Sequence, residues 1–290
     1  MTTQTKTLSI VIPVFNEEKR IRESLIELRS YLDAEEIEAE VVVVDDGSND
    51  KTMSILREFS DYIRILPAPE NRGKGHAVKR GVLSAKGEII LFMDADLATP
   101  LAEIKEFLKF SELTNYNYDI MIGSRFLRGR SVRRDSVRNF LGHLFKRVTN
   151  LLLPLAISDS QCGFKLFKKE CAVDIFRRTR IERWAFDMEA LFLADRLDYK
   201  VIEIPVAWQE MSGSHVHLVR DGFRMIIDLL AINFYGLTQP RYLRPLKSKP
   251  VVKPIPRIVT PSVRLSKNST IRPEMMAKPA YQVIENRKEL

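Results

Sequence analysis

Short apolar, β-branched runs alternate with amphipathic helical segments through the first half of this 290-residue chain, and that alternation constrains the fold more than any other feature. In the first such segment Ile21, Leu25, Leu28 and Leu32 recur at the spacing of one helix face. An alternation of strand and helix signals is typical of α/β domains with a central sheet flanked by helices. The runs predict strands at residues 8–14, 40–44, 63–66, 89–93 and 119–122.

Polar residues follow these runs at the points where the predicted strands end. Open α/β sheets bind ligands at the carboxyl ends of their strands, so residues there are candidates for a site. Several strands that deliver polar residues to one rim are harder to attribute to chance than any one of them. The residues are Asn16, Asp45, Asp46, Asp94, Asp96 and Arg125.

The sequence Asp94-Ala95-Asp96-Leu97 directly follows the apolar run 89–93. Two carboxylates two residues apart at the end of a strand point to the same side and repel each other unless a cation lies between them. A hard divalent cation that also holds phosphate oxygens meets this requirement. The alternative is an acidic turn that caps the next helix, but Thr99 and Pro100 fit that cap and first helical residue. We therefore predict Asp94 and Asp96 as metal ligands.

Charge is distributed unevenly between the globular part and the C-terminal end. Residues 240–290 contain 12 Lys and Arg, 3 Asp and Glu and 8 prolines, whereas residues 1–239 carry a balance of −1. We predict a basic, proline-rich, flexible tail after a nearly neutral domain. A nucleic-acid-binding fold would carry its positive charge on the folded surface, so nucleic acid is not an expected partner.

Two further features bound the cellular setting. Cys162 and Cys171 are too few for a disulfide framework and suit a reducing compartment. No apolar run reaches the roughly 18 residues that a spanning helix requires, so we expect a soluble or peripheral protein.

Five motifs in this order resemble those of family 2 glycosyltransferases, whose nucleotide-sugar-binding fold is called GT-A. The resemblance implies a mixed, mostly parallel sheet in a domain of residues 1–239, with a nucleotide-sugar half (1–125) and an acceptor half (126–239). Segments 159–165 and 184–189 resemble dolichyl- or polyprenyl-phosphate β-glucosyltransferases and, more distantly, dolichyl-phosphate mannosyltransferases. The five motifs are Ile12-Pro13-Val14-Phe15-Asn16-Glu17, Val44-Asp45-Asp46-Gly47-Ser48, Asn71-Arg72-Gly73-Lys74-Gly75, Asp94-Ala95-Asp96 and Gly123-Ser124-Arg125.

The resemblance also implies roles for individual residues. Asp94 and Asp96 would hold Mg²⁺ or Mn²⁺ and the donor's diphosphate, and Arg125 would face the phosphates. Gln161 and the segment 184–189 would border the sugar and the acceptor. Ala98 stands where mannosyl-transferring relatives often carry a polar residue, so no third side-chain ligand comes from that position. The base and ribose would be lined by Pro13, Phe15, Glu17, Asp46 and Lys74.

The acceptor decides which further groups are catalytic. A sugar hydroxyl requires a general base, for which Asp159 and Asp187 are candidates, although each could equally be a loop or capping residue. A lipid phosphate is already ionised and requires cations, for which Arg125 and Arg138 are candidates because guanidinium groups bind phosphate bidentately.

We predict an inverting, metal-dependent transferase that moves glucose from UDP-glucose to a polyprenyl (dolichyl-type) phosphate, peripherally bound on the cytoplasmic face of a membrane. The alternatives are a GDP-mannose-dependent mannosyltransferase, transfer to a saccharide hydroxyl, or an inactive nucleotide-sugar sensor. The basic-then-apolar stretch 137–157 and the helix 218–235 could face the membrane, pack in the core or support self-association. The apolar face of that helix contains Phe223, Ile226, Ile227, Leu230 and Phe234.

Overall fold

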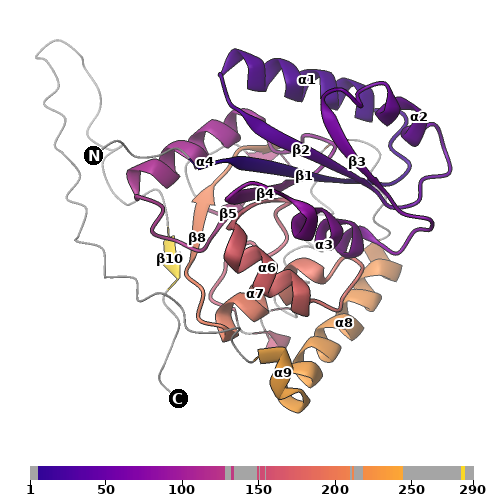
Figure 1. Ribbon diagram of the computed structural model, residues 1–290. Helices are drawn as coiled ribbons and strands as arrows, with labels where there is room; N and C mark the ends of the chain where they lie inside the picture. Colours follow the sequence, from indigo (N-terminus) through magenta and orange to yellow (C-terminus); the bar gives the residue numbers. More distant parts are fainter. Residues whose placement is uncertain are drawn as a thin grey trace, which may run out of the picture.

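The computed structural model describes residues 6–127, 132–133, 149, 151–153, 155–209, 211, 218–243 and 282–284. Strands and helices alternate from β1 to β5 and continue to α9, with a last short strand near the C-terminus (Figure 1). The strands are β1 (Leu8–Val14), β2 (Ala39–Asp45), β3 (Ile63–Pro67), β4 (Ile89–Met93), β5 (Ile120–Ser124), β6 (Val132–Arg133), β7 (Phe164–Lys168), β8 (Val201–Pro205), β9 (Trp208–Gln209) and β10 (Gln282–Ile284). The helices are α1 (Ile21–Ala34), α2 (Thr52–Arg57), α3 (Lys74–Ser84), α4 (Ala102–Leu113), α6 (Lys169–Arg178), α7 (Phe186–Arg196), α8 (Leu218–Thr238) and α9 (Pro240–Leu243).

An eight-stranded sheet in the order β10-β8-β5-β7-β4-β1-β2-β3 forms the centre. Neighbouring strands from β4 to β3 run parallel, as do β5 and β8. Strand β7 lies between β4 and β5 and runs antiparallel to both, and β10 runs antiparallel to β8. The expected mixed, mostly parallel sheet is therefore confirmed. Its antiparallel strand β7 places residues of the second half of the chain next to Asp94.

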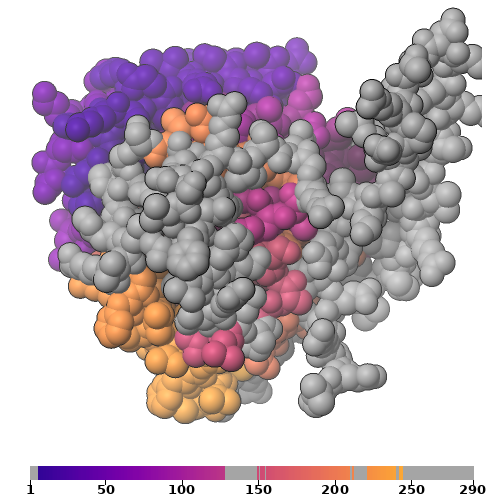
Figure 2. Space-filling model, turned by 180° about the vertical axis from the view of Figure 1, so that it is seen from behind, coloured from indigo at the N-terminus to yellow at the C-terminus, as the bar shows by residue number. Residues whose placement is uncertain are grey.

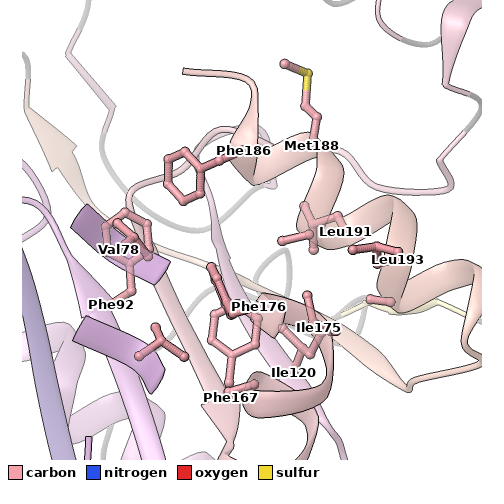
Figure 3. Close-up of a cluster of buried hydrophobic side chains, with 14 of the residues drawn as sticks. Val78, Phe92, Ile120, Phe167, Ile175, Phe176, Phe186, Met188, Leu191 and Leu193 are labelled. Carbon is pink, nitrogen blue, oxygen red and sulfur yellow. The ribbon is translucent and has the colours of Figure 1, made fainter. Parts of the chain in front are cut away.

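Helices cover both faces of the sheet (Figure 1). Apolar side chains of α1, α2 and α4 pack on one face, where Leu25 and Leu28 are almost fully buried. Helices α3, α6, α7 and α8 contribute the second core on the other face. Figure 3 shows its centre, in which Phe92 of β4 meets Phe186 of α7 edge to face, with 5.7 Å between ring centroids. The site described below lies at the strand ends above this core.

Helix α4 corrects one detail of the sequence analysis. Thr99 and Pro100 were expected as its cap and first residue, but the helix begins at Ala102 with Leu101 at the N-cap position. Among the described residues no side chain forms a cap hydrogen bond at this N-cap. The alternative of an acidic turn that caps the next helix therefore has no hydrogen bond to support it here.

Some sequence predictions fall largely outside the described residues. Arg138 lies outside them, as does most of the stretch 137–157. Within the tail, only α9 and β10 are described beyond residue 239. In the described part of the chain, no helix combines the length and the apolar character needed to cross a bilayer.

Candidate active site

Strand β4 ends at Met93, so Asp94 is the first residue beyond the strand and lies at the edge of the sheet. Its backbone N–H donates to the carbonyl oxygen of Gly163 at 3.2 Å, which extends the β4–β7 pairing. The Asp94 carboxylate lies directly against Gly163, where any Cβ atom would overlap it. Gly163 is therefore required by the close approach of the carboxylate, and the turn before β7 forms the wall behind Asp94.

Lys74, at the first position of α3, reaches the same carboxylate. Its Nζ lies 2.6 Å from Asp94 Oδ1 and packs over the rings of Phe92 and Trp184 at 5.4 and 5.6 Å. Burial alone would lower the pKa of Lys74, but the charges of Asp94 and Asp187 outweigh it and raise that pKa. The ammonium group is therefore charged at neutral pH. Lys74 was predicted to line the base and ribose, and the structure brings it to the carboxylates.

Asp96 completes the acidic pair. Its Oδ1 accepts a hydrogen bond from the backbone N–H of Ala98 at 3.1 Å. Burial and the nearby Asp94 carboxylate raise the pKa of Asp96. Lys74 also lowers the electrostatic cost of this pair, but two neighbouring carboxylates still favour additional positive charge.

A divalent cation fits the groups that these residues offer. Asp94 Oδ1 is buried, and the Lys74 ammonium group 2.6 Å away is its partner in an ion pair. Among the described residues no cluster of three or more His, Cys, Asp or Glu is present. Mg²⁺ and Mn²⁺ favour oxygen ligands, and Mg²⁺ in particular is commonly bound through one or two carboxylates together with substrate phosphates and water. Asp94 and Asp96 match that requirement.

Asp187 and Lys165 form a buried ion pair beside Lys74. Lys165 Nζ donates to Asp187 Oδ1 at 2.7 Å and to the Cys162 carbonyl oxygen at 2.5 Å, and the Lys165 side chain is 1% exposed. Burial raises the pKa of Asp187, against the opposing charges of Lys165 and Lys74. Sequence reasoning assigned no role to Lys165. The available signal was a lysine between Phe164 and Leu166, in a strand whose only other polar residue is Lys168 at its end.

Arg125 and Asp159 form a second pair at the end of β5. Arg125 Nε and one terminal nitrogen donate to the two oxygens of Asp159 at 2.7 and 2.8 Å, and its backbone N–H donates at 2.9 Å. Burial would raise the pKa of Asp159, but the guanidinium charge outweighs it and lowers that pKa. A carboxylate with a low pKa and both oxygens engaged is poorly suited as a general base. The guanidinium also packs over the Trp208 ring at 5.3 Å.

Asp46 holds a loop in this structure. Its Oδ2 accepts hydrogen bonds from Asn71 Nδ2 and from the backbone N–H groups of Arg72 and Gly73, at 3.0, 3.1 and 2.6 Å. Gly73 has a φ of 119°, a conformation that favours glycine. The Asp46 carboxylate is 2% exposed and shapes the loop that carries Lys74.

The remaining predicted residues lie around this centre. Pro13 is buried at the end of β1, with Phe15 and Glu17 half-buried just beyond it. Gln161 is half-buried in the turn between Asp159 and Gly163. A groove of about 470 Å³ lies nearby between residues 70–72, residues 180–183 and Asp228, but none of the predicted site residues lines it.

The architecture and these motifs match known proteins. The family described as Glycosyl transferase family 2 matches residues 9–176. A Dolichyl-phosphate beta-glucosyltransferase of Mus musculus is 39% identical over 249 residues, which cover 81% of this chain and 77% of the relative. Dolichyl-phosphate beta-glucosyltransferase ALG5C of Trichomonas vaginalis is 38% identical over 239 residues, covering 78% and 71%.

Solved structures agree on the fold. Glucosyl-3-phosphoglycerate synthase from Mycobacterium tuberculosis, in complex with Mn²⁺, UDP and glucosyl-3-phosphoglycerate, superposes with a TM-score of 0.57. The two chains are 22% identical, and the match covers 79% of each. The sheet, the motifs and the sequence similarity lead to one conclusion: the chain belongs to glycosyltransferase family 2 and is a glycosyltransferase of the GT-A fold.

Proposed function

We propose that this protein is an inverting, metal-dependent transferase that moves glucose from UDP-glucose to a dolichyl-type polyprenyl phosphate. The observation that carries the proposal is the pair Asp94 and Asp96 at the end of β4, with the charged Lys74 beside it. The relatives named above, which are dolichyl-phosphate beta-glucosyltransferases, support the sugar and the acceptor. The synthase solved with Mn²⁺ and UDP supports the donor and the metal.

The chain's own residues would divide the work as follows. Asp94 and Asp96 hold Mg²⁺ or Mn²⁺, which acts as a Lewis acid that neutralises the leaving diphosphate. Lys74 adds a positive charge at the same place. Because Gly163 has no side chain, the Asp94 carboxylate can lie directly against its backbone.

The pairing of the other carboxylates favours a phosphate acceptor. Asp159 is held by Arg125, and Asp187 is held by Lys165. A sugar hydroxyl would require a general base, whereas a lipid phosphate is already an ionised nucleophile. Two candidate bases that are both bound to cations therefore support transfer to phosphate. Arg125, and Arg138 outside the described residues, remain the proposed cations for that phosphate.

We also propose that α8 binds the membrane that holds the acceptor, on its cytoplasmic face. Met225, Leu229 and Ile232 of this helix are buried in the core, but a second apolar stripe faces outward. Figures 1 and 2 place α8, in orange, at the end of the molecule away from α1 and α2. An apolar helix face with no protein cover within the described residues suits insertion at a bilayer interface. The stripe consists of Phe223, Ile227, Leu230, Phe234 and Leu237, which are 51–88% exposed.

A transfer assay tests the reaction. The purified chain is incubated with polyprenyl phosphate, Mn²⁺ and either labelled UDP-glucose or labelled GDP-mannose, and lipid-linked sugar is extracted. We expect glucose transfer, and its loss in Asp96→Asn; the control Asp61→Asn changes an exposed carboxylate and should stay active. Transfer of mannose alone, transfer only to an oligosaccharide, or full activity of Asp96→Asn would overturn the assignment.

Vesicle sedimentation tests the membrane proposal separately. Phe234→Asp combined with Leu237→Asp should release the protein from anionic vesicles, because charge replaces the outward apolar face of α8. Leu113→Asp is the matched control, since Leu113 is 70% exposed at the end of α4. Equal binding of all three proteins would contradict a role for α8.

A further inference from the structure

Lys74 lies against one of the two carboxylate oxygens that Asp94 offers to a metal. Its Nζ lies 2.6 Å from Asp94 Oδ1, which is buried. An ammonium group and a divalent cation against the same carboxylate oxygen repel each other strongly, although the oxygen has two lone pairs. Binding of the metal through this oxygen therefore favours a movement of Lys74.

The backbone around Lys74 is fixed, so the movement is confined to the side chain. A Cβ atom on Gly75 would overlap Phe186 and the Ile181 carbonyl oxygen, which shows how closely α3 packs there. The His76 N–H donates to the Glu182 carbonyl oxygen at 3.0 Å. The lysine stem, by contrast, is flexible and carries three donors at its end.

A second carboxylate, that of Asp187, attracts the ammonium group when it leaves Asp94. The charge of Asp187 acts on Lys74 as the next strongest attraction after that of Asp94, and Asp96 also contributes. Asp187 itself is anchored by the buried Lys165. The ring of Trp184 lies beside Lys74 on the side of α7, and aromatic faces attract cations. The ammonium can thus shift by a rotation of its stem without losing its electrostatic support.

We propose that Lys74 is an internal counter-ion of the metal site: it neutralises Asp94 in the donor-free protein and passes to the donor's diphosphate when metal and nucleotide bind together. This rests on the proposed function, because it requires a metal at Asp94 and Asp96. The oxygens of the donor's diphosphate bind the ammonium group, while the metal binds the Asp94 oxygen.

The exchange couples the two ligands. Metal alone is repelled by the bound ammonium group and binds weakly, whereas a nucleotide diphosphate draws Lys74 away and frees the oxygen. Because coupling between two ligands is reciprocal, metal raises nucleotide affinity by the same factor. Typical coupling factors of 5- to 150-fold set the scale of the effect.

Calorimetric titration of Mn²⁺ into the full-length protein tests the exchange, with and without saturating UDP. In Lys74→Met we expect Mn²⁺ alone to bind about tenfold more tightly than in the wild type, and UDP to raise Mn²⁺ affinity by a smaller factor. Lys74→Arg retains a cation and should behave as the wild type for Mn²⁺ alone. Lys86→Met is the matched control. This exposed lysine precedes β4, whereas Asp94 follows the other end of the same strand.

The outcomes separate this inference from the proposed function. Equal or weaker binding of Mn²⁺ alone by folded Lys74→Met, as checked by circular dichroism, overturns the counter-ion role and leaves the metal site standing. Tighter binding in Lys86→Met as well would also overturn it, because a general charge effect would then account for the gain. Absence of Mn²⁺ binding in every variant, even with UDP, overturns the metal site itself.

Discussion

The buried ion pair between Lys165 and Asp187 makes a strong prediction for stability. Lys165→Met keeps the volume of the side chain but removes the cation that contacts the Asp187 carboxylate, which is 7% exposed, so that only the more distant charge of Lys74 remains. Removal of one partner from a buried pair costs about 3–5 kcal/mol, and the lost hydrogen bond to the Cys162 carbonyl is part of that cost. For a domain of this size the melting temperature should fall by on the order of 10 °C.

A second substitution, Asp187→Asn, distinguishes the cost of an unpaired buried charge from simple loss of packing. In Lys165→Met combined with Asp187→Asn no unpaired charge is buried, so most of the lost free energy of unfolding should return. Urea unfolding followed by tryptophan fluorescence measures both variants. Lys105→Met is the control, because it breaks the exposed pair with Glu35, and exposed ion pairs contribute little to stability. The reasoning would be refuted if the free energy of unfolding of Lys165→Met lay within about 1 kcal/mol of the wild type, or if the double variant were no more stable than Lys165→Met.

Three further predictions concern other contacts of the described residues. Gly163→Ala should push the Asp94 carboxylate aside and weaken Mn²⁺ binding in calorimetry, and an unchanged affinity would contradict the close approach described here. Asp159→Asn should destabilise the protein at neutral pH; because the pKa of Asp159 is lowered in the folded state, the difference from the wild type should shrink as the pH falls below about 3.8, and a difference that grows in acid would be inconsistent. Tyr242→Phe removes the 2.7 Å hydrogen bond to the buried Glu189 and should lower the free energy of unfolding by about 1–2 kcal/mol, with no loss expected if that hydroxyl were solvated.

The sequence predicts the strands of the first half well because their signals are local. The run 89–93 and the run 8–14 coincide with β4 and β1, since short, mostly apolar stretches of this length specify buried strands. Strand β7 was not assigned, because its place between β4 and β5 depends on pairing with residues 71–79 and 43–47 positions earlier. Antiparallel insertion of this kind leaves no local pattern.

The same distinction holds for the site. Asp94 and Asp96 stand together in the chain and could be recognised there, whereas Arg125 and Asp159 were identified separately and their pairing across 34 residues was not. Lys165 was overlooked because a lysine is almost never fully buried unless it is paired.

Helix α8 shows a third limit of periodicity. Its sequence carries apolar residues on more than one side, and the face chosen from the sequence contains Phe223 and Phe234, which the structure exposes. The core instead receives Met225, Leu229 and Ile232. Because apolar residues lie on more than one side of this helix, the pattern does not specify which side meets the protein.

The insertion of β7 also has a consequence for synthesis of the chain. The ribosome completes β5 at Ser124, but the strand that joins β4 to β5 begins only at Phe164. At roughly 5–20 residues per second, the nascent chain spends about 2–8 s before β7 can pair with β4 and β5, and β5 also lacks its other neighbour, β8, during that time. Unpaired edges recruit foreign strands, so this interval is the time at which a chaperone would protect the growing protein most.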